Sequence, residues 1–315
     1  MYPHWSSRLS TSVHSLLTLV FLCLLFASKA QAYEVIDSLG QRLQFERPPQ
    51  RIVSLLPSLT ESVCVLQACE RLVGVDRYSN WPASVESLPK VGGGLDPNIE
   101  MIVALQPDLV LLGTSSRASE RLKALGLKVA ALEPKTHADV RTVLGKVGQI
   151  LGQPTFYTYQ IWTGIERDIN QAAAEIPPQL RGQTVYFEAS PGPYAAGASS
   201  FIGETLTRLG LKNIVPASLG PFPKLNPEYV VSKDPDLIMA GDSATQDMLA
   251  YPGWKRMRAV RKQRVCQFSL AERDVLVRAG PRMGEAAKIM QRCVLGRTKA
   301  TVKASSKPKQ ALQNK

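Results

Sequence analysis

We predict an α/β protein with two lobes, each built around a parallel β-sheet, and one long backbone α-helix that joins them. Three observations support this fold class. Short apolar segments alternate with amphipathic segments from Arg51 onward, the same alternation begins again near Gln183, and a helical pattern without strands lies between. Such alternation is typical of parallel sheets covered on both faces. A chain of 315 residues is long enough for two domains.

The first lobe is expected over residues 33–152. Ser58-Leu59-Thr60-Glu61 has the S-x-x-E form of a capping box, so a helix should begin there, directly after the first strand. A later helix should run from a cap at Thr136 to Leu151, with Gly152 ending it. The strands of this lobe are expected at Ile52–Leu55, Leu72–Val75, Leu109–Leu112 and Val129–Leu132.

The linking helix is expected over residues 153–177. Pro154 suits its first position, and Pro177-Pro178 ends it. About 22 residues at 1.5 Å each make a rod of roughly 33 Å, long enough to cross from one lobe to the other. Apolar residues at helical spacing should form its packing stripe, at Ile161, Ile165, Ile169, Ala173 and Ile176.

The second lobe is expected over residues 178–296. A final helix from about Pro281 to Leu295 should close it. Its strands are expected at Thr184–Phe187, Leu237–Ala240 and Val265–Phe268, each followed by a loop or helix.

The two ends of the chain differ from its body. Residues 1–32 combine a cationic start with a short apolar run and an Ala-Gln-Ala motif, so we interpret them as a cleaved signal peptide. Residues 297–315 form a basic tail whose composition predicts disorder. Removing the two charges of the first segment and the six of the tail reduces the formal charge from +12 to +4. A body with this charge gives no indication of nucleic-acid binding.

Four cysteines remain in the mature chain. On one continuous helix, Cys64 and Cys69 would lie about 7.5 Å apart along the axis and on different faces, so they can pair only if the helix ends between them. Cys266 on a late strand and Cys293 on the last helix are the other candidate pair.

The sequence offers little catalytic chemistry. His137 is the single histidine after residue 32, so no multi-histidine metal site can form. No G-x-S-x-G elbow or phosphate-binding loop accompanies it. These absences argue against an enzyme and predict no resident cofactor or metal.

Aromatic residues instead occupy loops that should lie at strand ends. In open α/β sheets the carboxyl ends of strands carry the ligand crevice, and aromatic walls suit a large flat ligand. Asp274 and Arg278 come just before the last helix and could orient or hold polar groups of that ligand; a local ion pair at the helix start is the alternative explanation. The aromatic candidates are Tyr78, Trp81, Tyr194, Phe222 and Trp254.

One frame occurs twice. Glu100–Gly113 reads EMIVALQPDLVLLG and Glu228–Gly241 reads EYVVSKDPDLIMAG, so E-x6-P-D-L-x3-G repeats after 128 residues, the difference between 228 and 100. Each copy should be a helix that leads into a buried strand. A carboxylate at a helix N-terminus is favoured by the helix dipole, which would explain each glutamate singly.

The chain resembles the periplasmic binding proteins with a helical backbone in an ordered series of segments. These are RIVSLLPSLTE from Arg51, LVGVD from Leu72, both E-x6-P-D-L frames and RAGPR from Arg278. That family serves ABC importers of vitamin B12, ferric siderophores and haem. The likeness runs from about residue 33 to 295. It implies Rossmann-like lobes, a ligand between them, and one surface glutamate per lobe that docks on the permease.

The resemblance implies specific roles. Glu100 and Glu228 match the docking glutamates, and Tyr78, Tyr194, Phe222, Asp274 and Arg278 match positions that grip the ligand in the vitamin B12 binder. We therefore expect a monomer in the periplasm that delivers a bulky metal chelate, foremost a corrinoid, to an ABC permease. Three alternatives remain open: a siderophore or haem receptor, a tetrapyrrole metal chelatase, and a secreted interaction module without a small ligand.

Overall fold

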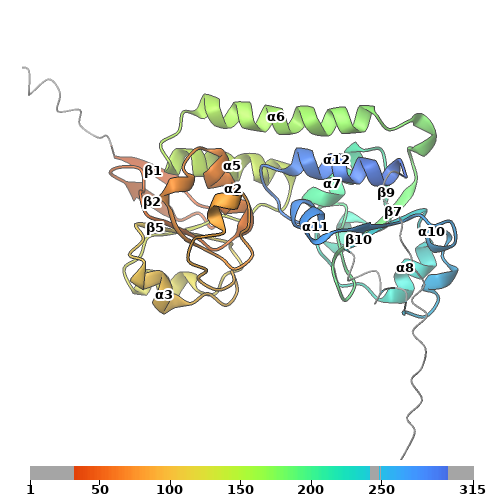
Figure 1. Ribbon diagram of the computed structural model, residues 1–315, viewed down its shortest axis with the longest axis horizontal. Helices are drawn as coiled ribbons and strands as arrows, with labels where there is room; N and C mark the ends of the chain where they lie inside the picture. Colours follow the sequence, from red (N-terminus) through yellow and green to blue (C-terminus); the bar gives the residue numbers. More distant parts are fainter. Residues whose placement is uncertain (1–31, 242–247, 249, 297–315) are drawn as a thin grey trace, which may run out of the picture.

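The computed structural model describes residues 32–241, 248 and 250–296. Residues 1–31 and 297–315 lie outside the described residues, so nearly all of the expected signal peptide and all of the expected tail cannot be compared with it. Two α/β lobes lie at the two ends of the molecule, and the long helix α6 runs along one side of both (Figure 1). The predicted fold class is confirmed. Among the described helices, none has the length and hydrophobicity that crossing a bilayer requires.

The first lobe is built on a four-stranded parallel sheet in the order β4-β3-β5-β6. Every residue of β3, β5 and β6 is buried, because helices cover both faces of a parallel sheet. A two-stranded hairpin, β1–β2, precedes it and was not predicted. The strands are β1 Tyr33–Ile36, β2 Arg42–Phe45, β3 Ile52–Ser54, β4 Leu72–Val75, β5 Leu109–Leu112 and β6 Val129–Ala131; the helices are α2 Pro57–Val65, α3 Ile99–Ala104, α4 Ser119–Ala124 and α5 His137–Ile150, with 3₁₀ turns at Cys69–Arg71 and Ala83–Val85.

The second lobe has a mixed sheet in the order β11-β10-β7-β8, with β9 beside β7. Its three long strands are parallel, as expected, and the two-residue β8 is antiparallel to β7. The strands are β7 Thr184–Ser190, β8 Tyr194–Ala195, β9 Lys212–Asn213, β10 Leu237–Gly241 and β11 Val265–Phe268; the helices are α7 Phe201–Arg208, α8 Pro227–Lys233, α10 Arg258–Arg261, α11 Leu270–Leu276 and α12 Met283–Val294, with 3₁₀ turns at Pro178–Leu180, Ala217–Leu219 and Trp254–Arg256.

Helix α6, Thr155–Ala174, packs against α5 of the first lobe and α12 of the second. Two glycines allow this close approach. A Cβ atom on Gly148 of α5 would lie 2.3 Å from Cγ2 of Thr158, and one on Gly284 of α12 would lie 2.7 Å from Cβ of Asp168. Because 20 residues rise about 30 Å, this helix braces both lobes with one rigid element.

The prediction of a capping box at Ser58 was wrong, and the prediction of a helix cap at Thr136 was right. Helix α2 begins at Pro57, with Leu56 as its N-cap and no side-chain cap, because proline is well suited to the first helical turn. Ser58 is therefore inside the helix, and Glu61 is free to bind elsewhere. Thr136 does cap α5, in a capping box with Asp139.

The repeated frame forms the same local structure twice. Asn98 caps α3 by accepting a hydrogen bond from Met101, and Asn226 caps α8 by accepting one from Glu228. Each glutamate of the frame is thus in the first turn of a capped helix and exposed to solvent.

The Pro-Asp-Leu part of the frame fixes the strand that follows. The Asp108 carboxylate accepts hydrogen bonds from the backbone N–H groups of Gln50 and Arg51 at 2.8 and 3.0 Å, next to the start of β3. The Asp236 carboxylate accepts from the backbone N–H and the hydroxyl of Thr184, the first residue of β7, at 2.9 and 2.8 Å. Each aspartate therefore fixes the start of its own strand, β5 or β10, to the neighbouring strand, β3 or β7.

The described residues contain two disulfides. Cys266 on β11 is bonded to Cys293 on α12, the candidate pair named from the sequence. Cys64 is bonded to Cys69, with Cα atoms 4.2 Å apart. The condition for that second pair is met because α2 ends at Val65, between the two cysteines.

Candidate functional site

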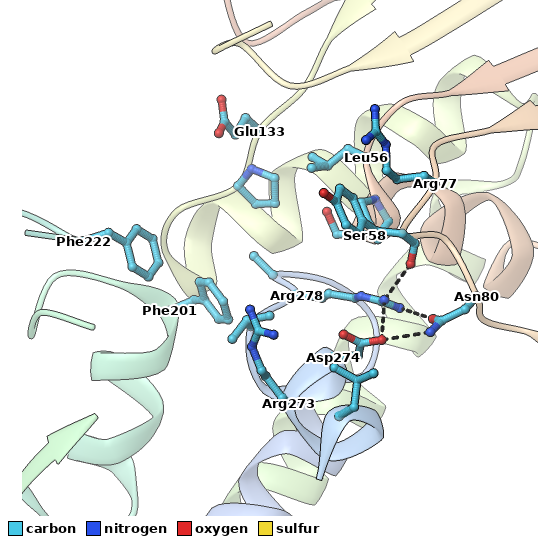
Figure 2. A pocket seen from close by; sticks show the side chains of 16 residues that line it. Leu56, Ser58, Arg77, Asn80, Glu133, Phe201, Phe222, Arg273, Asp274 and Arg278 are labelled. Atoms are coloured by element: carbon cyan, nitrogen blue, oxygen red, sulfur yellow. Dashed lines mark hydrogen bonds and ion pairs between the residues drawn. The ribbon is translucent and has the colours of Figure 1, made fainter. Parts of the chain in front are cut away.

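A cleft of about 670 Å³ opens between the two lobes. Its lining is mainly apolar, and both lobes contribute to it. The loops after β3, β4 and β6 form one wall, and the second lobe supplies the other from α7, the loop before α8, and α11 (Figure 2). This is the position expected from the carboxyl ends of parallel strands. The lining residues are Leu56, Pro57, Ser58, Arg77, Tyr78, Asn80, Glu133, Pro134, Phe201, Phe222, Leu270, Arg273, Asp274, Val277, Arg278 and Ala279.

Aromatic rings stand on both walls. Tyr78 is 62% exposed at the first wall, with the Arg77 guanidinium 5.9 Å from its ring centre. Phe201 and Phe222 pack together on the second wall, with ring centres 6.0 Å apart (Figure 2). The exposed rings of Tyr78 and Phe222 on facing walls can sandwich a large flat ligand, and the buried Phe201 packs against Phe222.

The turn that presents Tyr78 is held from beneath by Asp76. This buried carboxylate accepts hydrogen bonds from the backbone N–H of Tyr78 at 2.9 Å and from the hydroxyl of Ser79. Burial raises the pKa of Asp76 above its ordinary value, although these hydrogen bonds and the nearby Arg278 and Lys90 oppose the shift. Tyr78 therefore lies on a turn whose conformation is already fixed by hydrogen bonds to Asp76.

A buried ionic network joins the lobes beside the cleft. Glu61 of α2 is 1% exposed and accepts from Arg278 at 2.8 Å and from Arg282 at 2.7 and 3.1 Å. Arg278 also donates to the backbone carbonyl of Tyr78 and to the side chain of Asn80. We call this network the interlobe cluster; its members are Glu61, Asn80, Asp274, Arg278 and Arg282.

This network changes the expected role of Asp274 and Arg278. The Arg278 guanidinium is 7% exposed, and its nitrogens contact Glu61, Asp274, Asn80 and the carbonyl of Tyr78 within the chain. Figure 2 shows the contacts with Asp274 and Asn80. Asp274 accepts from Arg278 at 2.9 Å and from Asn80 at 2.8 Å. Both residues line the cleft as predicted, but their polar groups hold the two walls together.

Three predicted ligand residues do not line this cleft. Trp254 was placed wrongly: it is fully buried in the core of the second lobe, packs against Tyr186 and Tyr251, and donates its indole N–H to the carbonyl of Pro227 at 3.2 Å. Trp81 is half-buried, and its ring faces the Arg282 guanidinium at 5.0 Å. Tyr194 is exposed on β8, outside the lining, near the Lys224 ammonium.

Sequence reasoning missed other lining residues. Phe201 follows the N-cap Ser200 and carries no local mark of a binding role. Glu133 and Arg273 lie in segments where charged residues are ordinary. Glu61 was interpreted as a capping residue because the S-x-x-E motif looks the same whether its glutamate caps the helix or, as here, pairs with Arg278 and Arg282. In the described parts of the chain, no group of histidine, cysteine, aspartate and glutamate side chains could hold a metal ion.

Comparison with known proteins identifies the family. A model of the family described as periplasmic binding protein matches residues 52–268. The chain belongs to this family. Its members are substrate-binding transport proteins rather than enzymes, which confirms that part of the sequence-based expectation.

Two relatives and one solved structure show the range of similar proteins. This periplasmic binding protein is 28% identical over 260 residues to an uncharacterized ABC transporter substrate-binding lipoprotein of Bacillus subtilis, covering 79% of this chain and 81% of the relative. It is 26% identical over 251 residues to a vitamin B12-binding protein of Pectobacterium atrosepticum, covering 76% and 86%. A periplasmic heme binding protein from Pseudomonas aeruginosa has the same fold, with a TM-score of 0.68, 24% identity, and coverage of 80% and 94%.

Proposed function

We propose that this protein is the receptor of an ABC importer and carries a bulky metal chelate, a corrinoid, between its lobes. The observation that supports this most directly is the interlobe cleft, whose facing aromatic rings suit the face and edge of a macrocycle. The likeness to the vitamin B12-binding protein of Pectobacterium atrosepticum supports the choice of a corrinoid. Residues 33–152 and 178–296 would be the two lobes, and residues 153–177 the link.

Binding to the purified protein tests this proposal. Cyanocobalamin should quench tryptophan fluorescence saturably, with Trp81 as the main reporter because it contacts Arg282 of the interlobe cluster beside the cleft, whereas Trp162 and Trp254 are buried outside the cleft lining. Tyr78→Ala should weaken binding at least about tenfold, since it removes a ring from the cleft wall. Tyr159→Ala is the matched control, because Tyr159 is a similarly exposed tyrosine on α6. Absence of any response to cobalamins, ferric siderophores and haem would refute the proposed ligand class.

A haem or ferric siderophore receptor is the second candidate. The exposed phenol of Tyr78 at the cleft favours haem, because a tyrosine oxygen can be an axial ligand to haem iron. A haem titration of Tyr78→Phe separates the two ligands. If Tyr78→Phe abolishes the shift of the haem absorbance band, the Tyr78 oxygen is a ligand to the haem iron. A corrinoid that only packs on the ring should bind this variant normally.

We further propose that Glu100 and Glu228 dock on the two halves of the permease. Each is exposed in the first turn of a capped helix. Helices α3 and α8 lie on opposite lobes, both on the side of the molecule away from α6 (Figure 1). Glu100 makes an exposed ion pair with Arg121 at 3.1 Å, which a competing partner could displace at little cost.

Charge reversal tests the docking. Glu100→Lys with Glu228→Lys should abolish transport in vesicles that contain the permease, while ligand affinity stays unchanged. Glu120→Lys is the matched control, since Glu120 is an exposed glutamate in the first turn of α4. Normal transport by the double variant would contradict the proposal. We also propose that the protein acts as a monomer in the periplasm after cleavage of residues 1–32.

A further inference from the structure

Among the described lining residues, two arginines, Arg77 and Arg273, lie outside the interlobe cluster. Arg273 lies on α11, one position before Asp274, and is half-buried. Its stem passes over the end of β10, where a Cβ atom on Gly241 would lie 3.1 Å from Cδ of Arg273. Figure 2 shows its guanidinium beside Phe201, directed into the space between that ring and Arg278. The glycine at this strand end therefore leaves room for the arginine to reach the cleft.

In the part of the chain that the structure describes, the acidic side chains near Arg273 are engaged by other groups. Glu272 pairs with Arg292 at 3.1 Å. Asp274 is held by Arg278 and Asn80.

On the opposite wall, Glu133 accepts hydrogen bonds from the hydroxyls of Thr114 and Ser115 and from the backbone N–H of Ser115. Among the described residues, no carboxylate lies within ion-pair distance of Arg273. The described lining residues include three arginines, Arg77, Arg273 and Arg278, against the two carboxylates of Glu133 and Asp274.

A guanidinium has five N–H donors and keeps its charge at any physiological pH. In a mainly apolar cleft, bound ligand would remove water from Arg273, and none of the described carboxylates would then neutralise its charge, which is costly. The arginine therefore suits a ligand that brings its own acceptor. Arg77 is less suited to this task because it already pairs with Asp96 at the rim.

We propose that Arg273 is an oxyanion subsite and that the cargo carries a phosphate or carboxylate group, oriented toward the second lobe. This inference rests on the proposed function and adds a chemical requirement to it. A corrinoid meets the requirement through the phosphodiester of its nucleotide loop, and haem meets it through its propionates. A macrocycle whose side chains are all neutral would lack the partner that the cleft offers.

The test compares pairs of related ligands in which one member lacks the anionic group. For a corrinoid, cyanocobalamin has the phosphodiester and dicyanocobinamide lacks it together with the nucleotide base. For haem, the dimethyl ester removes the propionate charges. Arg273→Gln should weaken binding of cyanocobalamin, or of haem, by about 10- to 100-fold, the range for a hydrogen bond to a charged group, and should leave binding of the uncharged counterpart unchanged.

Two further variants complete the experiment. Arg261→Gln is the matched control, an exposed arginine at the end of α10 in the same lobe and outside the cleft lining, and should change no affinity. Arg273→Lys keeps the charge but loses the fork, so its effect should fall between those of wild type and Arg273→Gln. Equal losses for charged and uncharged ligands, or no loss with either, would overturn the subsite while leaving the proposed function standing. Failure of wild type to bind any of the four ligands would overturn both.

Discussion

The interlobe cluster makes Glu61→Gln the most informative single change. Glu61 is almost fully buried, and its partners Arg278 and Arg282 are 7% and 13% exposed. The substitution leaves two guanidinium groups facing a neutral amide in a site that excludes water. Removing one partner of a buried ion pair costs about 3–5 kcal/mol. That is a large share of the roughly 5–15 kcal/mol by which a folded protein is stable.

Urea unfolding followed by tryptophan fluorescence measures this free energy. Glu100→Gln is the control, because it breaks the exposed pair with Arg121, a type of interaction worth about 0–1 kcal/mol. Replacing Glu61, Arg278 and Arg282 together by methionine should restore much of the lost stability, since no buried charge remains. A loss for Glu61→Gln no greater than that of Glu100→Gln would refute the reasoning that the cluster holds the lobes together.

Three further predictions follow from burial and covalent links. Replacing Cys266 and Cys293 by serine should cost about 3–4 kcal/mol and replacing Cys64 and Cys69 about 2 kcal/mol, because the first pair closes a span of 27 residues and the second a span of 5; equal losses in urea unfolding would contradict the loop-entropy argument. Trp254→Phe should lower the free energy of unfolding by about 2 kcal/mol, because side-chain volume and the hydrogen bond to Pro227 are lost. This variant should keep the fluorescence quenching by ligand, whereas Trp81→Phe should remove it. Burial lowers the pKa of His137 below its ordinary value, although the negative charge of Glu204 opposes this shift, so the unfolded chain takes up a proton at a higher pH than the native protein does. The free energy of unfolding should therefore fall as the pH drops below about 6.5. His137→Gln should make this pH dependence weaker, and an unchanged pH dependence would contradict the argument.

The layout of the two lobes could be predicted because buried parallel strands are continuous apolar runs. β5 and β10 are clear in the sequence, and so is α6, whose length and bounding prolines mark it. The β1–β2 hairpin and the two-residue strands β8 and β9 were missed. They lie at sheet edges or alone, where backbone pairing requires little apolar sequence.

The binding site was only partly predictable, because contacts between distant residues decide it. Tyr78 and Phe222 line the cleft as loop aromatics should, yet Trp254 comes from a similar loop and is buried. Glu61 has the pattern of a helix cap, but its partners lie 217 and 221 positions further along the chain. Local sequence cannot distinguish these cases.

Helix α6 braces both lobes through α5 and α12, while the interlobe cluster joins them beside the cleft. On the docking proposed above, the spacing between Glu100 and Glu228 is then nearly the same in the empty and the loaded protein. The importer would receive no signal of occupancy from that spacing, so an empty receptor would compete with a full one for the same permease. Uptake should therefore depend on the ratio of loaded to empty receptor, and overproducing the receptor at limiting cargo should slow transport.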